Sequence, residues 1–241
     1  MIIESLDNNR IKNIRKLNEK KYRDEEKLFI VEGEHLVLEA YKTGYLKEVV
    51  LCERDIDLDI EKIYVSKNVM NSLSSLPSKV DIIGICKIVD NELDLSSNIL
   101  ILDNIQDPGN LGAIIRSAVA FNLKNIILSN DSVDLYNTKV LRSSQGMNFH
   151  LNIVREELTS IIPKLKDNNY IIYGTNVIEG IDVKSVSRDK KYAIIMGNEG
   201  NGISKKVNEL VDKNIYININ KNCESLNVAV SASIILYELG N

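Results

Sequence analysis

The second half of the sequence alternates short apolar segments with longer segments of helical periodicity, and this alternation restricts the fold more than any other feature. Strands that are apolar along their whole length are buried on both faces, which is typical of parallel strands connected by helices. We therefore predict an α/β fold with a mostly parallel sheet and helices on both of its faces. The predicted strands are Ile99–Leu102, Asn125–Leu128, Tyr170–Tyr173, Tyr192–Met196 and Asn214–Ile217, and the predicted helices are Leu111–Asn122, Glu156–Lys166, Ser204–Val211 and Leu226–Leu239.

The N-terminal part of the chain alternates in the same way and is predicted to form a smaller α/β domain. A polar stretch, Asp90–Asn98, separates it from the strands that follow and is the candidate linker. Because 241 residues are enough for two domains, we place them at residues 1–92 and 98–241. The predicted N-terminal elements are strands at Leu28–Val31, Lys47–Cys52, Ile63–Val65 and Val80–Val89 and helices at His35–Lys42 and Lys67–Leu76.

The composition argues against several classes of protein. No apolar run approaches the length of a membrane span, and the start, MIIESLDNNR, lacks the apolar core of a signal peptide. The three cysteines are widely spaced, and the two histidines offer little for a metal site. We therefore expect a cytoplasmic protein with reduced thiols, no membrane association and no metal.

Seven basic residues and a single acid, Glu19, lie between Arg10 and Arg23, although the net charge of the chain is −4. Apolar residues recur at helical spacing in this stretch, so we predict one amphipathic helix with a basic outer face. Such a face suits the phosphate backbone of a nucleic acid, although a solvated helix explains the same pattern and is favoured by the pattern alone. The residues that would contact the phosphates are Arg10, Lys12, Arg15 and Lys16.

The loop from Asp103 to Asn110 connects a predicted strand to a predicted helix. Its Asp-Pro-Gly-Asn segment is typical of a turn, and Asn110 is expected to cap the helix. Arg116 lies in the otherwise apolar helix that follows. Because a buried unpaired guanidinium is costly, we expect Arg116 to have an anionic partner, either a carboxylate in a structural ion pair or a bound phosphate.

Two further loops follow predicted strands at the same edge of the sheet. Residues 197–202 contain three glycines, which allow the backbone to approach a ligand closely, but their order fits neither the dinucleotide fingerprint nor a phosphate loop. Residues 217–228 lead into the last predicted helix, for which Ser225 is the expected N-cap. Since ligands of open parallel sheets bind beyond the carboxyl ends of the strands, we expect a ligand site where the three loops meet.

Together the three loops resemble the sequence motifs of the SpoU-type (TrmH-like) branch of the SPOUT methyltransferase superfamily. The first motif, D-P-G-N-L-G-A-I-I-R, is residues 107–116, the second, M-G-N-E-G-N-G-I, is residues 196–203, and the third ends in E-S-L-N-V at residues 224–228. The resemblance covers roughly residues 99–239. The N-terminal part, including F-I-V-E-G at residues 29–33, resembles the substrate-binding domain that precedes the catalytic domain in many of these enzymes.

The resemblance implies a C-terminal α/β-knot, in which a mostly parallel sheet is tied into a trefoil, behind a smaller α/β RNA-binding domain. It implies S-adenosylmethionine as the cofactor and a homodimer, formed through the C-terminal domain, whose site is completed across the interface. The implied reaction is methylation of a ribose 2′-hydroxyl in RNA without a metal. We favour ribosomal over transfer RNA, because the N-terminal domain and the basic helix suit a large folded substrate.

The resemblance also assigns site residues by their positions in the motifs. The cofactor would be held by Gly197, Ile217 and Leu226, with backbone near Thr175 and Asn176. The catalytic or supporting residues would be Asn110, Arg116, Glu199, Ser225 and Asn227. Two positions depart from the family: Asn218 stands where it has proline, and Lys221 stands where it has glycine. A lysine there is expected to intrude on the adenosine or to reach an RNA phosphate.

Several alternatives stay open at this point. The family proposal gives removal of the hydroxyl proton to Arg116, but a guanidinium stays protonated in water to about pH 12, so clamping an RNA phosphate is the other role for it. A non-catalytic RNA-binding or ribosome assembly factor with the same fold is the second functional hypothesis. A transfer RNA 2′-O-methyltransferase and a base-methylating enzyme are further hypotheses.

Overall fold

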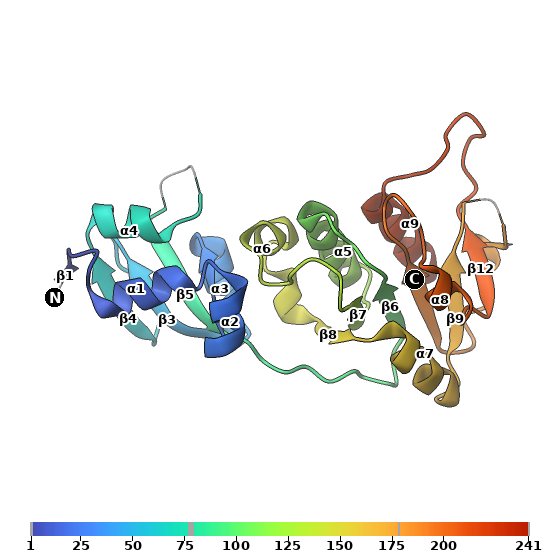
Figure 1. Cartoon of the computed structure of the whole chain (residues 1–241), viewed down its shortest axis with the longest axis horizontal. Coiled ribbons are helices and arrows are strands. Elements are labelled where there is room, and N and C mark those ends of the chain that lie inside the picture. Colours follow the sequence, from blue (N-terminus) through green and yellow to red (C-terminus); the bar gives the residue numbers. More distant parts are fainter. Residues whose placement is uncertain (1, 77–79, 178, 241) are drawn as a thin grey trace. The chain divides into compact units, whose positions relative to one another are not determined.

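The computed structural model describes residues 2–76, 80–177 and 179–240. By their packing these residues divide into two compact units (Figure 1). The first comprises residues 1–90 and 134–149, and the second comprises residues 91–133 and 150–241. The predicted division at 1–92 and 98–241 differs from these units chiefly at residues 134–149, which pack in the first unit.

The first unit is built on a five-stranded mixed sheet. In this sheet β5 is antiparallel to both of its neighbours, β3 and β2, and β4 is parallel to both of its neighbours, β3 and β1. In order across the sheet, the strands are β1 (Ile2–Ile3), β4 (Glu61–Val65), β3 (Leu46–Leu51), β5 (Ile82–Lys87) and β2 (Leu28–Glu32). The four predicted N-terminal strands are therefore present, and β1 is an addition.

Helices cover both faces of this sheet, because alternate strand residues point to opposite sides. On one face, α1 (Asn9–Lys16) and α4 (Lys67–Leu73) contribute to a core that includes Ile30 and Val50. On the other face lie α3 (Glu34–Lys42) and α6 (Thr138–Ser144), whose Leu141 packs in a core with Phe29 and Val49.

The single basic helix predicted between Arg10 and Arg23 is wrong, because the chain forms two short helices there. The first, α1, ends at Lys16, and α2 (Lys20–Glu26) starts after a turn. The turn lets Leu17, 3% exposed, stay in the core. It also buries Arg23, which the predicted pattern placed on the solvated face. Asn18 and Glu19 make turn hydrogen bonds back to residues three positions earlier, as is common where a helix ends.

A buried ion pair joins residues 134–149 to the rest of the first unit. Arg23 Nη2 on α2 lies 2.5 Å from Asp134 Oδ2, and the two side chains are 7% and 18% exposed. The same guanidinium donates to the carbonyl oxygen of Leu17 at 2.8 Å. These contacts give both terminal nitrogens of the buried guanidinium a partner, and its burial would otherwise be costly.

The second unit is built on a seven-stranded sheet in which all neighbouring strands are parallel. It contains all five strands predicted for this half of the chain and two that were missed, β8 and β10. In order across the sheet, the strands are β10 (Ile181–Asp182), β12 (Lys213–Tyr216), β9 (Ile171–Thr175), β11 (Tyr192–Met196), β6 (Ile99–Leu102), β7 (Asn125–Ser129) and β8 (Asn152–Glu156).

Helices cover this second sheet as well. On one face, α7 (Leu158–Asp167) and α8 (Lys205–Asn208) pack in a core with alternate strand residues such as Ile101 and Ile195. Two long apolar helices, α5 (Pro108–Ala120) and α9 (Val228–Gly240), pack against each other (Figure 1).

The connections of the second unit agree with the predicted α/β-knot. After the edge strand β8 the chain crosses back to β9, then places β11 between β9 and β6, and then adds β12 outside β9. From β12 it runs through residues 217–227 into α9, which returns to α5.

Two negative findings concern the described residues only. Within residues 2–76, 80–177 and 179–240, no helix has the length and apolarity to span a membrane. In the same ranges no group of three or more histidine, cysteine or carboxylate side chains is arranged to hold a metal ion.

The ion pair between Arg23 and Asp134 gives a test of the first unit. The substitution Asp134→Ala leaves the Arg23 guanidinium buried without its carboxylate and should lower the free energy of unfolding by about 3 kcal/mol, measured by urea denaturation. Asp24→Ala is the matched control, because Asp24 pairs with Lys20 on the exposed face of α2 and should cost less than about 1 kcal/mol. Equal effects of the two substitutions would show that the buried pair does not anchor residues 134–149.

Candidate active site

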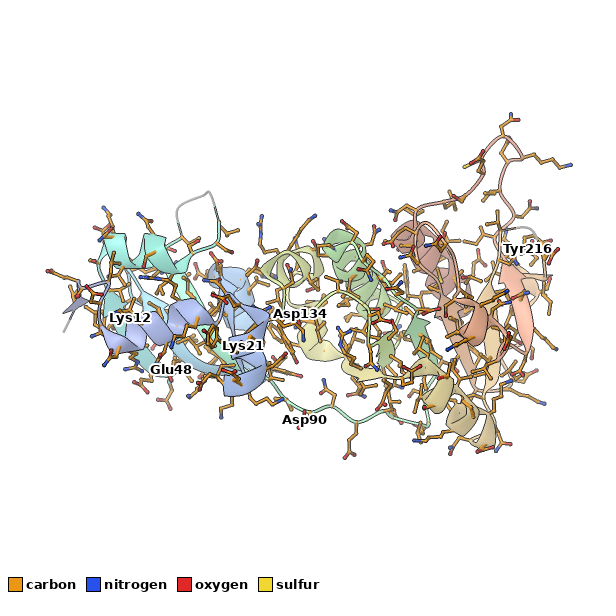
Figure 2. The ribbon with its side chains drawn as sticks, in the orientation of Figure 1. Lys12, Lys21, Glu48, Asp90, Asp134 and Tyr216 are labelled. Atoms are coloured by element: carbon orange, nitrogen blue, oxygen red, sulfur yellow. The ribbon has the colours of Figure 1, made fainter. Side chains whose placement is uncertain are left out.

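A cavity of about 440 Å³ lies at the carboxyl ends of β9, β11 and β12 in the second unit. Residues that end or follow these strands line it, among them Thr175, Met196 and Tyr216. Tyr216 is labelled in Figure 2 at the end of β12. The predicted ligand site of the parallel sheet therefore lies at the expected edge.

The cavity brings together every residue predicted to hold the cofactor. Its lining includes Thr175, Asn176, Gly197, Ile217 and Leu226. The remaining wall is part apolar and part polar: it contains the side chains of Ile215, Ile219, Val228 and Ile235 and those of Asn198, Glu199 and Ser231. Apolar surfaces for the faces of an adenine, with polar groups beside them for a ribose and an amino acid, fit S-adenosylmethionine chemically.

The glycine loop owes its shape to a close approach of backbone to backbone. A Cβ atom at Gly197 would lie 2.1 Å from the carbonyl carbon of Gly202 and 2.2 Å from the nitrogen of Ile203. Asn198 and Gly202 exchange two backbone hydrogen bonds of 2.9 Å. Gly202 has a φ of +67°, which favours glycine. Gly197 is therefore required first by the loop itself, and only then by a ligand.

Two polar side chains join the glycine loop to the first motif loop. Asn198 Nδ2 donates to the carbonyl oxygen of Asn104 at 2.8 Å, while its Oδ1 accepts from the backbone nitrogens of Gly200 and Asn201. Asp103, which is buried, accepts from the backbone nitrogen of Ser204 at 2.7 Å. Segments about a hundred positions apart in the chain are thereby held together.

Three of the predicted catalytic residues form one hydrogen-bonded chain. Asn227 Nδ2 donates to Asn110 Oδ1 at 3.0 Å, and Asn110 Nδ2 donates to Glu199 Oε1 at 2.8 Å. Each of the three comes from a different motif. Glu199, Asn227 and Ser225 also line the cavity. Glu199 Oε1 accepts the hydrogen bond from Asn110, and the other carboxylate oxygen of Glu199 takes no part in this chain.

Arg116 is the predicted catalytic residue that the structure does not bring into this group. It lies on α5 and is exposed, so the expectation that it is buried is wrong. Across the described residues no hydrogen bond or ion pair involves the Arg116 side chain, so the carboxylate alternative is also wrong and the phosphate alternative stays a prediction. Helical geometry explains the error, because the apolar residues on both sides of it point to other faces of α5.

Two predicted helix caps are also wrong, each by a few residues. Asp107, not Asn110, caps α5, and its Oδ1 accepts from the backbone nitrogen of Asn110 at 2.8 Å. Asn227, not Ser225, caps α9, and its Oδ1 accepts from the backbone nitrogen of Ala229 at 2.9 Å. Because Asn110 does not cap α5, its side chain is available to donate a hydrogen bond to Glu199.

Lys221 does not intrude on the cavity, contrary to the expectation for the adenosine. It is exposed, as is Asn218, and neither belongs to the cavity lining. Ile217 and Ile219 from the same loop do line it. The departures from the family motif therefore lie on the solvent side of this loop.

Arg155 is a supporting residue that the sequence did not indicate. Its guanidinium donates to the carbonyl oxygens of Ser129, Asn130, Ser132 and Val133 at 2.7 to 2.9 Å. The hydroxyls of that turn accept in their turn from the backbone nitrogens of Asn104 and Ile105. Arg155 thus supports the first motif loop through the turn that binds it. It lies on β8, a strand that was itself not predicted.

The four residues predicted to contact nucleic acid have protein partners. Arg10 pairs with Glu48 at 2.7 Å and with Glu61. Lys12 pairs with Asp7, and the hydrogen bond from Lys12 lowers the pKa of that carboxyl. Figure 2 labels Lys12 on α1 and Glu48 on β3. Arg15 donates to Ser72 at 3.0 Å, and Lys16 lies 5.5 Å from the ring centroid of Tyr22.

The glycine loop allows a test with two matched substitutions. Gly197→Ala places a methyl group against the backbone of Gly202, so the loop must move and S-adenosylmethionine affinity should fall about tenfold or more in calorimetric titration. Gly200→Ala, in the same loop and also in the cavity lining, is the matched control, because its Cβ would meet only Asn198 Oδ1, at 3.5 Å, and no backbone. Unchanged affinity in Gly197→Ala would contradict the role assigned to the loop.

Two family models match separate parts of the chain. Residues 97–237 match the SpoU rRNA methylase family, and residues 8–84 match the MRM3-like substrate-binding domain. The 23S rRNA (guanosine(2553)-2′-O)-methyltransferase RlmP of Bacillus subtilis is 35% identical over 243 aligned residues, which cover 98% of this chain and 98% of RlmP.

Solved structures agree over nearly the whole chain. An RNA 2′-O ribose methyltransferase, 27% identical, superposes with a TM-score of 0.83 over 99% of this chain and 98% of its own. An rRNA methyltransferase from Sinorhizobium meliloti with bound AdoMet, 25% identical, superposes with a TM-score of 0.85 over 99% of this chain and 97% of its own. The predicted resemblance and fold class are confirmed: this chain belongs to the SpoU rRNA methylase family.

Proposed function

We propose that the chain transfers a methyl group from S-adenosylmethionine to a ribose 2′-hydroxyl of ribosomal RNA. The observation that carries this proposal is the meeting of all three motifs at one cavity, where Asn227, Asn110 and Glu199 form a chain of hydrogen bonds. Support comes from RlmP, which is named as a 23S rRNA 2′-O-methyltransferase, and from the match to a substrate-binding domain.

The side chains at the cavity have to orient a hydroxyl and receive its proton. S-adenosylmethionine, when bound, supplies the methyl group of a sulfonium. Displacement at that carbon is in line, so most of the catalytic effect comes from the position of the ribose. The hydroxyl loses its proton as the bond forms. Among the described residues that line the cavity, Glu199 alone carries a carboxylate, and Asn110 fixes one of its oxygens.

The proposed role of Arg116 is to bind the RNA, and not to pair with another side chain of the protein. Its guanidinium is exposed and has no partner among the described residues, so it is available to bind a phosphate by two parallel hydrogen bonds. A phosphate held in this way would fix the sugar next to it. This role requires no proton transfer by Arg116.

The enzyme acts as a homodimer whose interface includes the outer faces of α5 and α9. Support comes from two exposed apolar side chains on α9, Val230 at 48% and Tyr237 at 56% exposed. Val230 and Tyr237 lie seven positions apart, about two turns along one face of α9, and apolar side chains exposed on one helix face are typical of an interface. Since Arg116 contacts none of the other predicted catalytic residues in its own chain, a second copy is the source of the missing guanidinium.

The preference for ribosomal RNA over transfer RNA rests on the relatives and on the separate N-terminal unit. The cytoplasm is the location we expect for such an enzyme. A non-catalytic RNA-binding factor is not favoured by any feature of the site, because the cavity and all five predicted catalytic residues are present.

The substitution Arg116→Ala tests the proposed reaction. It should lower kcat/KM for methyl transfer from labelled S-adenosylmethionine to a 23S ribosomal RNA transcript by about 100-fold or more, because the ribose is no longer fixed. Calorimetric titration with the cofactor should give the wild-type affinity, since Arg116 does not line the cavity. Normal turnover would remove Arg116 from the mechanism.

The substitution Val230→Asp tests the proposed dimer. A carboxylate in an apolar interface is costly to desolvate, so sedimentation should shift from dimer towards monomer and methyl transfer should fall in parallel. Val89→Asp is the matched control, because Val89 is similarly exposed, at 44%, and belongs to the first unit. A monomeric wild-type enzyme with full activity would exclude the dimer.

A further inference from the structure

We propose that a hollow between α3 and α6 in the first unit binds a phosphate of the RNA backbone, with Arg142 as its main ligand. The inference rests on the proposed function, because it names where the RNA substrate touches the first unit. It replaces the basic face of α1 as the expected RNA contact.

The hollow has a volume of about 730 Å³ and a basic lining. His35 and Leu36 from α3 face Arg142 and its neighbours from α6, and no carboxylate is among the described residues that line it. The lining residues are His35, Leu36, Lys139, Arg142, Ser143 and Gln145. A hollow with Arg142 in its lining, and with no carboxylate among its described lining residues, attracts a backbone phosphate in preference to an uncharged ligand.

The helix that carries Arg142, α6, is well packed in the first unit. Val140, Leu141 and Ser144 of α6 are buried, and the Ser144 hydroxyl lies 3.1 Å from Asn148 Oδ1. Gly146, with a φ of +80°, lets the chain pass close to Glu39: a Cβ atom there would lie 3.0 Å from that of Glu39. His35 Nε2 lies 3.2 Å from the carbonyl oxygen of Gln145 and thereby joins α3 to the end of α6.

The contrast with α1 and α2 favours the hollow as the phosphate site. Arg10 on α1 pairs with two glutamates, and on α2 Lys20 pairs with Asp24. A phosphate that bound at Arg10 or Lys20 would compete with a carboxylate already in place. Arg142 is exposed, and within the described ranges it has no hydrogen bond or ion pair through its guanidinium. It can therefore bind a phosphate without first losing a partner.

A guanidinium and a phosphate are complementary in shape as well as in charge. The planar fork of Arg142 can donate two parallel hydrogen bonds to two phosphate oxygens. Such a contact neutralises one backbone charge and carries no sequence information. We therefore expect the hollow to set the position of the RNA on the enzyme, while the methylated nucleotide is chosen at the cavity of the second unit.

The test is binding of a 23S ribosomal RNA transcript to the whole chain over a range of salt concentrations. Arg142→Ala should weaken binding about tenfold at low salt. It should also reduce the slope of log K against log salt by about 1, as loss of one phosphate contact requires. Arg142→Lys, which keeps the charge, should show a smaller loss of affinity. Lys87→Ala is the matched control, because Lys87 is an exposed cation of the first unit outside the hollow.

The outcomes separate this inference from the proposed function. S-adenosylmethionine affinity should be the same in all these variants, because the residues that line the two sites are different. If Arg142→Ala binds the transcript with wild-type affinity and slope while the wild type methylates it, the hollow is not a phosphate site and the proposed function stands. If the wild type neither binds nor methylates the transcript, both proposals are wrong.

Discussion

The hydrogen bonds of Asn198 hold the candidate active site together. Its side chain binds Asn104 of the first motif loop and two backbone nitrogens of its own glycine loop, and its backbone closes that loop on Gly202. The loop can close only because Gly197 carries no side chain. With the two loops joined, Glu199 lies within reach of Asn110. The geometry of the reacting groups therefore depends on polar contacts between loops that surround a largely apolar sheet.

The two long helices of the second unit, α5 and α9, have one role at their N-termini and another along their exposed faces. At their N-termini, Asp107 and Asn227 satisfy free backbone nitrogens, and the side chains around these caps connect the first motif to the third. Farther along, α9 exposes Val230 and Tyr237, and α5 exposes Arg116. The same pair of helices thus organises the cavity and, in the proposed dimer, provides the surface that meets a second copy.

The pattern of charge in the sequence did not show which basic residues of the first unit lack acidic partners. The basic residues between Arg10 and Arg23 dominate the sequence pattern, yet Arg23 is buried with Asp134 and Arg10 is bound to acids from strands distant in the sequence. Arg142 lies in a short, inconspicuous helix, and packing places it in a hollow without acids. A cation that the fold leaves without a carboxylate can bind a phosphate without first losing that partner.

The sequence by itself determined the parallel sheet and the three motif loops, because these follow from local periodicity and turn chemistry. The resemblance of those loops to a known family assigned the cofactor residues that line the cavity. It did not determine β8 or α6, whose short polar segments carry no clear periodic signal. Only the tertiary structure decided that Asp107 and Asn227 are the caps, that Arg116 is exposed and that Arg23 is buried. Each of these depends on which partner lies nearby in space, and residues far apart in the chain provide those partners.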